Sequence, residues 1–241
     1  MVSNDKALKR VRRRANPPEE VGAILKELEG VLNIPDDAGR VVSNARFGAY
    51  AFYDYDGEPI YVGQTAEQLR VRIRRHLTNQ RTDAVAMHVL DPFEVADIEM
   101  WPLWELEGAA RDAKMVKATL NSAEYTVFKK VLTGSIFQAV LNEVPIAPTQ
   151  IMALPPSLRA RIVPEPIYTR RKHADVRIAR RAETIAKLAA VISQRSVKPG
   201  LRNTLLVQAT RLRHLAEVRL KDAGGPPEPG HYEEAETQGD A

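Results

Sequence analysis

The chain has 241 residues, a formal net charge of +4 and no cysteine. The absence of cysteine excludes disulfides, thiolate zinc sites and cysteine nucleophiles. No apolar run approaches the ~18 residues of a membrane-spanning helix, and the basic N-terminus is not followed by the hydrophobic stretch of a signal peptide. We therefore expect no membrane partner, and a length suited to one core with appendages or to two small domains.

The net charge conceals a segregation along the sequence. Residues 1–14 carry a net charge of +5, residues 15–158 carry −7, residues 159–221 carry +12 and residues 222–241 carry −6. Basic segments on both sides of an acidic middle are expected if they hold a polyanion. Residues 1–15 predict a disordered basic arm, which either contacts phosphate or is simply a solvated run of charge. Residues 223–241, acidic and rich in Pro and Gly, predict a disordered tail.

The first predicted element is a helix that ends near Leu32. Asn16 and Pro17 favour its start, and Glu19 adds an acid in the first turn. Apolar residues then recur at helical spacing until residues 35–39, where Pro, Asp and Gly end the helix.

A β-hairpin and another helix follow. Residues 47–53 are rich in aromatic and small apolar side chains and predict a strand, whereas residues 60–62 predict the return strand. Asp56-Gly57 between them is a hairpin turn signal, because Gly readily adopts the positive φ of such turns. Thr65 and Gln68 have the spacing of a capping box, so they predict the start of a helix with apolar residues at every fourth position.

Further elements are predicted downstream. Residues 95–102 alternate between apolar and acidic side chains and predict a third strand. Residues 104–118 predict a weakly periodic helical insertion. Asn121 predicts the cap of a helix over residues 122–132, which places Glu124 in the first turn. An acid at that position either stabilises the helix dipole or serves as a metal ligand.

The C-terminal third predicts a linker and a pair of helices. Six prolines between residues 145 and 166 indicate a stiff linker, which we place at residues 147–168. Residues 169–222 predict a helical hairpin interrupted at Lys198-Pro199-Gly200. Its basic outer faces make it a candidate DNA-binding module, the alternative being a packing element with an Arg-rich surface. The candidate contacts there are Arg170, Arg171, Lys172, Arg177, Arg180 and Arg181.

One ordered set of residues resembles the GIY-YIG nuclease family over roughly residues 45–145. The two triplets are Gly48-Ala49-Tyr50 and Tyr61-Val62-Gly63, with ten residues between the tyrosines. Arg72 and His76, four residues apart and so on one face of the next helix, match the family's Arg and His. Arg70 is a competing match for the Arg, although Arg72 is the one in step with His76. Glu124 fits the family's metal-binding Glu, and Asn142 its Asn.

This resemblance implies a fold. Residues 16–146 would form a catalytic domain that includes the N-terminal helix, with a three-stranded mixed sheet flanked by helices. The C-terminal helical hairpin would be added to this domain. The expected fold class is therefore α+β.

The resemblance also implies a metal-dependent DNA endonuclease, of restriction type or otherwise site-recognising. Glu124 would hold Mg²⁺ or Mn²⁺, and Arg72 would bind the scissile phosphate. Tyr50, Tyr61 and His76 would share the activation of the attacking water. Asn142 would fix a ligand or the phosphate, and the nearby Arg70 and Arg75 are candidate nucleic-acid contacts.

Partners and alternatives follow from the same set. DNA is the expected partner, with a homodimer as one way to cut both strands, in the cytoplasm of a bacterium or from a phage gene. One alternative is a non-catalytic nucleic-acid-binding protein with the same fold. Another is a ribonuclease or RNA-binding protein.

Overall fold

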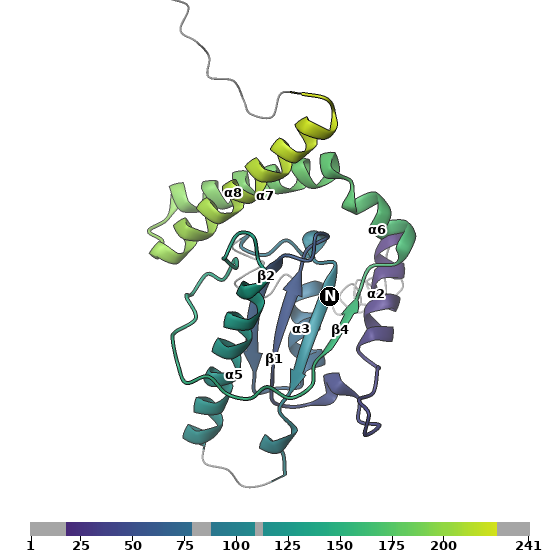
Figure 1. Ribbon diagram of the computed structural model, residues 1–241, viewed down its shortest axis with the longest axis vertical. Helices are drawn as coiled ribbons and strands as arrows, with labels where there is room; N and C mark the ends of the chain where they lie inside the picture. Colours follow the sequence, from purple (N-terminus) through teal and green to yellow (C-terminus); the bar gives the residue numbers. More distant parts are fainter. Residues whose placement is uncertain (1–17, 79–87, 109–112, 226–241) are drawn as a thin grey trace, which may run out of the picture.

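The computed structural model describes residues 18–78, 88–108 and 113–225. It is an α+β fold, as expected, with a sheet between helices and a helical hairpin across one end (Figure 1). The predicted arm at residues 1–15, the predicted helix start at Asn16-Pro17, and the predicted tail from residue 226 onward lie outside the described residues. None of the helices in the described ranges combines the length and apolarity needed to cross a bilayer.

The elements follow one another in the order helix, hairpin, helix, strand, helix, strand and three helices. Short 3-10 turns lie at Val42–Asn44, Pro92–Glu94 and Trp104–Leu106. The helices and strands are α2 (Glu19–Val31), β1 (Gly48–Tyr53), β2 (Pro59–Thr65), α3 (Leu69–Thr78), β3 (Asp97–Pro102), α5 (Ala113–Thr133), β4 (Leu158–Arg161), α6 (Glu165–Lys172), α7 (Ala174–Gln194) and α8 (Pro199–Asp222).

The sheet has four strands in the order β2-β1-β3-β4, and every pairing is antiparallel. The expected three-stranded mixed sheet is therefore wrong. The fourth strand, β4, lies inside the predicted linker. Pro155, Pro156 and Pro164 flank this strand without entering it, and it pairs only with β3 at the sheet edge, where nearby proline is tolerated. The many prolines on both sides of β4 predicted a linker there, so this short strand was not predicted.

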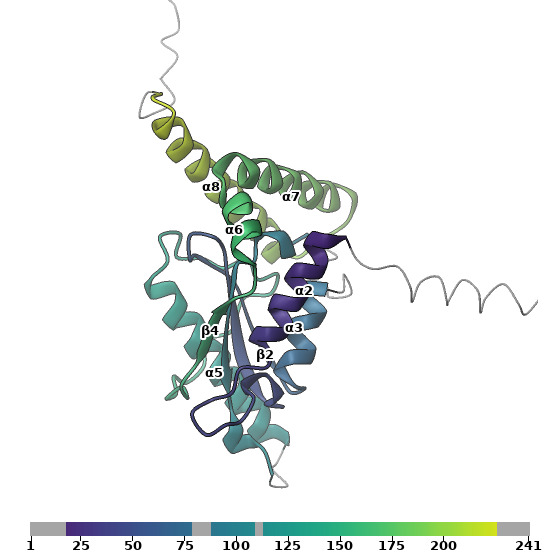
Figure 2. The ribbon, with the colours of Figure 1, turned by 90° about the vertical axis from the view of Figure 1, so that its right-hand side faces the viewer.

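The strand β1 is the centre of the core and is buried along its whole length. Tyr50 and Phe52 face the layer of α2 and α3, whereas Ala49 and Ala51 face α5. Figure 2 shows these helices on opposite sides of the sheet. The side of β1 that faces α5 therefore carries small side chains, and the side that faces α3 carries aromatic ones. The aromatic side includes Tyr50 and forms part of the site described below.

Two helices start at other positions than expected. The helix α5 begins at Ala113 and includes residues 113–118 of the predicted insertion, so Asn121 does not cap it and Glu124 lies in its middle. Good helix formers such as Ala, Lys and Met extend the helix although its first turns bury little surface. Thr65 belongs to β2, and its hydroxyl accepts the Glu67 N–H at 3.1 Å in a local turn instead of capping α3.

The predicted C-terminal hairpin is confirmed as α7 and α8, which pack against each other and lie across the end of the sheet where β1 turns into β2 (Figure 1). Its contact with the sheet is charged, which the prediction of basic outer faces did not anticipate. Arg177 and Arg181 point inward and are 2% and 3% exposed. The hairpin is thus packed on the rest of the protein through buried charged side chains.

Candidate active site

A cleft of about 480 Å³ lies at the edge strand β2, and most of the residues predicted to be catalytic line it. Both faces of the sheet contribute, because side chains alternate along β2. Tyr61 belongs to the side of α3, and Glu124 reaches the cleft from α5 on the other side. Five of the six predicted residues lie on its walls, namely Tyr61, Arg72, His76, Glu124 and Asn142.

Tyr50, the sixth predicted residue, lies behind the cleft wall with no exposed surface. Its hydroxyl is 2.9 Å from Nε2 of His76, and Nε of Arg72 donates to the same oxygen at 3.4 Å. The helix α3 makes this possible because positions four apart on a helix are neighbours on one face. The resemblance thus predicted three side chains that the fold does bring together.

Gly63 makes room for Tyr50. The two residues are cross-strand partners in the β1–β2 register. A Cβ at position 63 would be 2.6 Å from the Tyr50 hydroxyl oxygen and 2.7 Å from Cζ, which is closer than real Cβ contacts. The glycine is therefore required because the tyrosine side chain crosses directly over the backbone of β2.

Burial sets the protonation of this cluster. The pKa of His76 falls to about 4, first because burial disfavours the charged ring and then because Arg72 and Arg75 are nearby. The pKa values of Tyr50 and Tyr61 are raised, chiefly by burial. At neutral pH the ring is neutral and both phenols keep their protons. The Tyr50 oxygen then accepts from Nε of Arg72, and the same hydroxyl is hydrogen-bonded to Nε2 of the neutral His76 ring.

Glu124 stands on the opposite wall and has one hydrogen-bond partner among the described residues. Nε2 of Gln64 donates to Oε2 of Glu124 at 3.0 Å and to Oδ1 of Asn121 at 2.7 Å. Burial raises the pKa of Glu124, while the Gln64 hydrogen bond and Arg72 act in the opposite direction. Sequence reasoning missed Gln64, whose amide side chain next to Gly63 in a mostly apolar strand was the available signal.

The donor atoms on this wall determine whether a divalent cation fits it. Within the described ranges, no three His, Asp or Glu side chains are grouped so that together they could hold a metal ion. Glu124 nevertheless offers a carboxylate to a cleft that has space for water, and Mg²⁺ characteristically binds through one or two carboxylates and keeps several waters. The residues present therefore fit a cation bound through Glu124 and water.

Asn142 lines the cleft, but both ends of its side-chain amide form hydrogen bonds with the backbone of β2. Its Oδ1 accepts the Val62 N–H at 3.2 Å, and its Nδ2 donates to the Val62 carbonyl oxygen at 2.7 Å. The neighbouring Leu141 N–H bonds to the Ile60 carbonyl oxygen at 2.8 Å. This segment therefore pairs with the free edge of β2, and the expected role of Asn142 in fixing a ligand does not fit these bonds.

The choice between the two candidate arginines is decided by position. Arg70 donates to Asn44 and Asn33, at 2.7 and 2.9 Å, and does not line the cleft. Arg72 contacts Tyr50 and lines the cleft, as expected from its spacing to His76. Arg75 also lines the cleft and is paired with Glu67.

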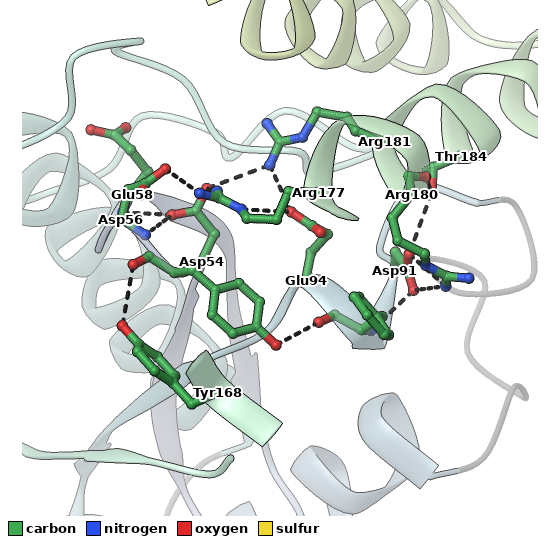
Figure 3. Close-up of polar contacts among 12 residues, drawn as sticks. Asp54, Asp56, Glu58, Asp91, Glu94, Tyr168, Arg177, Arg180, Arg181 and Thr184 are labelled. Carbon is green, nitrogen blue, oxygen red and sulfur yellow. Dashed lines mark hydrogen bonds and ion pairs between the residues drawn. The ribbon is translucent and has the colours of Figure 1, made fainter. Parts of the chain in front are cut away.

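The predicted nucleic-acid contacts of the C-terminal region are engaged within the protein. Arg170 and Arg171 both pair with Glu20 of α2. A second group pairs with carboxylates near the β1–β2 turn and the 3-10 turn before β3 (Figure 3). Arg177 and Arg181 are buried there, so their expected contact with DNA is wrong, and Arg180 is paired with Asp91. Lys172 remains exposed.

Comparisons of this chain with models of known protein families, with curated proteins and with solved structures find no match. The functional argument therefore depends on the site itself. The site combines a phenol hydrogen-bonded to a neutral imidazole, a guanidinium on the same phenol, and a carboxylate across the cleft.

Proposed function

We propose that the chain is a metal-dependent endonuclease of the GIY-YIG type, hydrolysing phosphodiester bonds in DNA. The observation that carries this proposal is the contact of Tyr50 with both His76 and Arg72 beside a cleft that Glu124 faces from the other wall. Phosphodiester cleavage requires a proton acceptor, a cation for the phosphate and neutralisation of the developing charge. The side chains around this cleft supply the first two.

Each residue has a role that its position supports. Arg72, whose pKa is raised above its ordinary value, keeps its charge and offers its remaining donors to a phosphate in the cleft. Tyr61 lines the cleft and would orient the attacking water. Neutral His76 accepts a proton, either from that water or from the hydroxyl of Tyr50. A bound Mg²⁺ or Mn²⁺ would stabilise negative charge on the phosphate, and Glu124 would hold it.

The surface next to the cleft supports DNA as the substrate. Gly200 at the start of α8 packs on the carbonyl oxygen of Glu143 and on Pro145, and both of these residues line the cleft. Lys198 and Arg202 beside it are exposed, and within the described ranges neither forms an ion pair with a carboxylate. These two cations can therefore meet phosphates that flank the scissile bond, while most of the predicted arginines cannot.

The test is cleavage of supercoiled plasmid and phage DNA by the full-length protein, with and without Mg²⁺. Wild-type protein should cleave only with the cation, and Glu124→Gln should abolish cleavage while DNA affinity stays within a few fold. Arg72→Ala should lose on the order of 10²–10³ in rate, the scale for one preorganised charge stabiliser. The matched control is Glu143→Gln, which alters another carboxylate of the same cleft and should cleave normally.

The cleavage products distinguish the kinds of nuclease that the protein could be. Discrete fragments indicate a restriction-type or other site-recognising enzyme, and a homodimer would then place one cleft on each strand. A smear indicates cleavage without site recognition. Cleavage of RNA alone would make the protein a ribonuclease. No cleavage of either polymer would contradict the proposal and favour a nucleic-acid-binding protein with this fold.

A further inference from the structure

We infer that Arg211 of α8 is a positioning residue for the candidate active site, holding the edge strand β2 and the outer wall of the cleft in place. This inference rests on the proposed function for its catalytic consequence. It begins from a side chain that is 1% exposed and lies in the C-terminal hairpin, outside the region that resembles a nuclease.

The guanidinium bridges two segments of backbone. One terminal nitrogen of Arg211 donates to the carbonyl oxygen of Pro59 at 2.8 Å and to that of Ala139 at 2.7 Å. Pro59 begins β2 two residues before Tyr61, and Ala139 comes three residues before Asn142. Burial lowers the pKa of Arg211 to about 10, so the group remains charged at neutral pH and its hydrogen bonds are charge-assisted.

Other residues of α8 contact the same outer segment. The hydroxyl of Thr204 lies 3.4 Å from the Asn142 carbonyl oxygen and 3.1 Å from that of Gly200, so its one proton is shared between them. A Cβ on Gly200 would lie only 2.0 Å from the Glu143 carbonyl oxygen, so helix and segment are in close contact there. Three positions along α8, at residues 200, 204 and 211, thus follow the outer segment from residue 143 back to residue 139.

That segment in turn holds the strand that carries Tyr61. Leu141 and Asn142 bond to Ile60 and Val62, the residues on either side of the tyrosine. The residues that follow, 143–147, line the cleft. Arg211 therefore ties together the two backbone segments whose separation sets the position of the Tyr61 side chain and the width of the cleft.

The hairpin is held on the sheet by residues other than Arg211. The docking of the hairpin can therefore be distinguished from the effect of Arg211 on β2. Figure 3 shows Arg177 and Arg181 of α7 reaching carboxylates of the β1–β2 turn and of the turn before β3. Because α7 packs along α8, these contacts locate the hairpin without Arg211. Losing Arg211 should consequently loosen the segment and β2 while leaving the hairpin docked.

The test uses full-length protein and amide hydrogen exchange measured by NMR. In Arg211→Met, exchange at the Val62 and Leu141 amides should accelerate at least on the order of tenfold, since local opening governs protection there. Amides of the β1–β3 ladder should stay protected. Arg213→Met is the control, because that side chain lies on the same helix but is 77% exposed and pairs with Glu217. Unchanged exchange in Arg211→Met, or acceleration spread evenly over the sheet, would overturn the inference.

A second pair of variants covers the case in which Arg211→Met does not fold. Arg211→Lys keeps a buried cation that can reach one carbonyl oxygen. Thr204→Val removes the hydroxyl that contacts the carbonyl oxygens of Asn142 and of Gly200 within α8. Both should show a smaller acceleration confined to the same two amides. If the two amides exchange as in wild type in both variants, Arg211 and its helix do not position β2.

The kinetics of DNA cleavage test whether the contacts of Arg211 affect the reaction. In Arg211→Met, kcat for DNA cleavage should fall about tenfold with KM nearly unchanged, because the buried guanidinium does not touch DNA, and Arg211→Lys should recover part of the rate. A change in KM alone would contradict a positioning role. If wild-type protein cleaves no substrate, the proposed function fails, and the exchange measurement still decides whether Arg211 holds the segment.

Discussion

Replacing Arg177 by Met should destabilise the protein strongly without affecting DNA binding. The Arg177 side chain is 3% exposed and lies 3.0 Å from Asp54, whose side chain is 2% exposed. It also pairs with Asp56 at 2.5 Å, and Figure 3 shows it between the two carboxylates. The pKa of Arg177 is raised: burial alone would lower it, but the neighbouring acids, Asp54 first, outweigh burial.

The magnitude follows from what the substitution leaves behind. Asp54 would keep Arg181 at 3.5 Å but lose its nearer cationic partner. Removing one member of a buried ion pair costs about 3–5 kcal/mol, because the other charge stays buried without compensation. That is a large part of the ~5–15 kcal/mol stability of a typical domain. Arg177→Met with Asp54→Asn should recover much of the loss, because the double variant leaves less uncompensated charge.

The assay is urea unfolding at neutral pH, combined with DNA affinity measured at several salt concentrations. Lys187→Met on the same helix is the matched control, because its pair with Glu183 is exposed and should contribute little. The reasoning is refuted if Arg177→Met loses less than about 1 kcal/mol. It is also refuted if folded Arg177→Met binds DNA more weakly with a flatter salt dependence, since Arg177 would then contact phosphate.

Three further predictions concern the cleft and its surroundings. The pKa of His76 is about 4 in the native protein against an ordinary 6.5, so the unfolded chain binds the proton first as pH falls. Between pH 6.5 and 4 the free energy of unfolding of wild type should therefore fall by about 3 kcal/mol more than that of His76→Gln, measured by urea unfolding. Lys198→Ala with Arg202→Ala should lower the slope of log K against log salt by up to about two, measured by DNA titration. Gly63→Ala should cost about 1–3 kcal/mol and reduce cleavage, because the added methyl group overlaps Tyr50.

The hairpin, α3 and the spacing of Arg72 and His76 were predictable because they depend on local patterns. Aromatic residues, a Gly turn and a four-residue repeat each specify one element without reference to distant parts of the chain. The fold then supplies the contact that the pattern implied, with Tyr50 hydrogen-bonded to His76. Local signals sufficed here because the whole cluster comes from one continuous stretch of sequence.

The rest depended on partners far apart in sequence. The strand β4 is specified by pairing with β3, about sixty residues earlier, and the local density of proline argued against it. Asn142 is about eighty residues from Val62, and its sequence neighbours do not indicate that its side chain forms hydrogen bonds with the backbone of an edge strand. Gln64 likewise acquires its role only when α5 brings Glu124 to it.

The segregation of charge has a structural explanation that changes where nucleic acid can bind. The acidic middle and the basic C-terminal region are separate segments of the sequence, yet many of their charges pair with each other when the chain folds. Each such pair removes a cation from the surface available to phosphate. The +12 of residues 159–221 therefore overstates the charge that DNA would encounter. Among the described residues, the cations best placed for a bound strand are those beside the cleft, Arg72 on its wall with Lys198 and Arg202 at the start of α8.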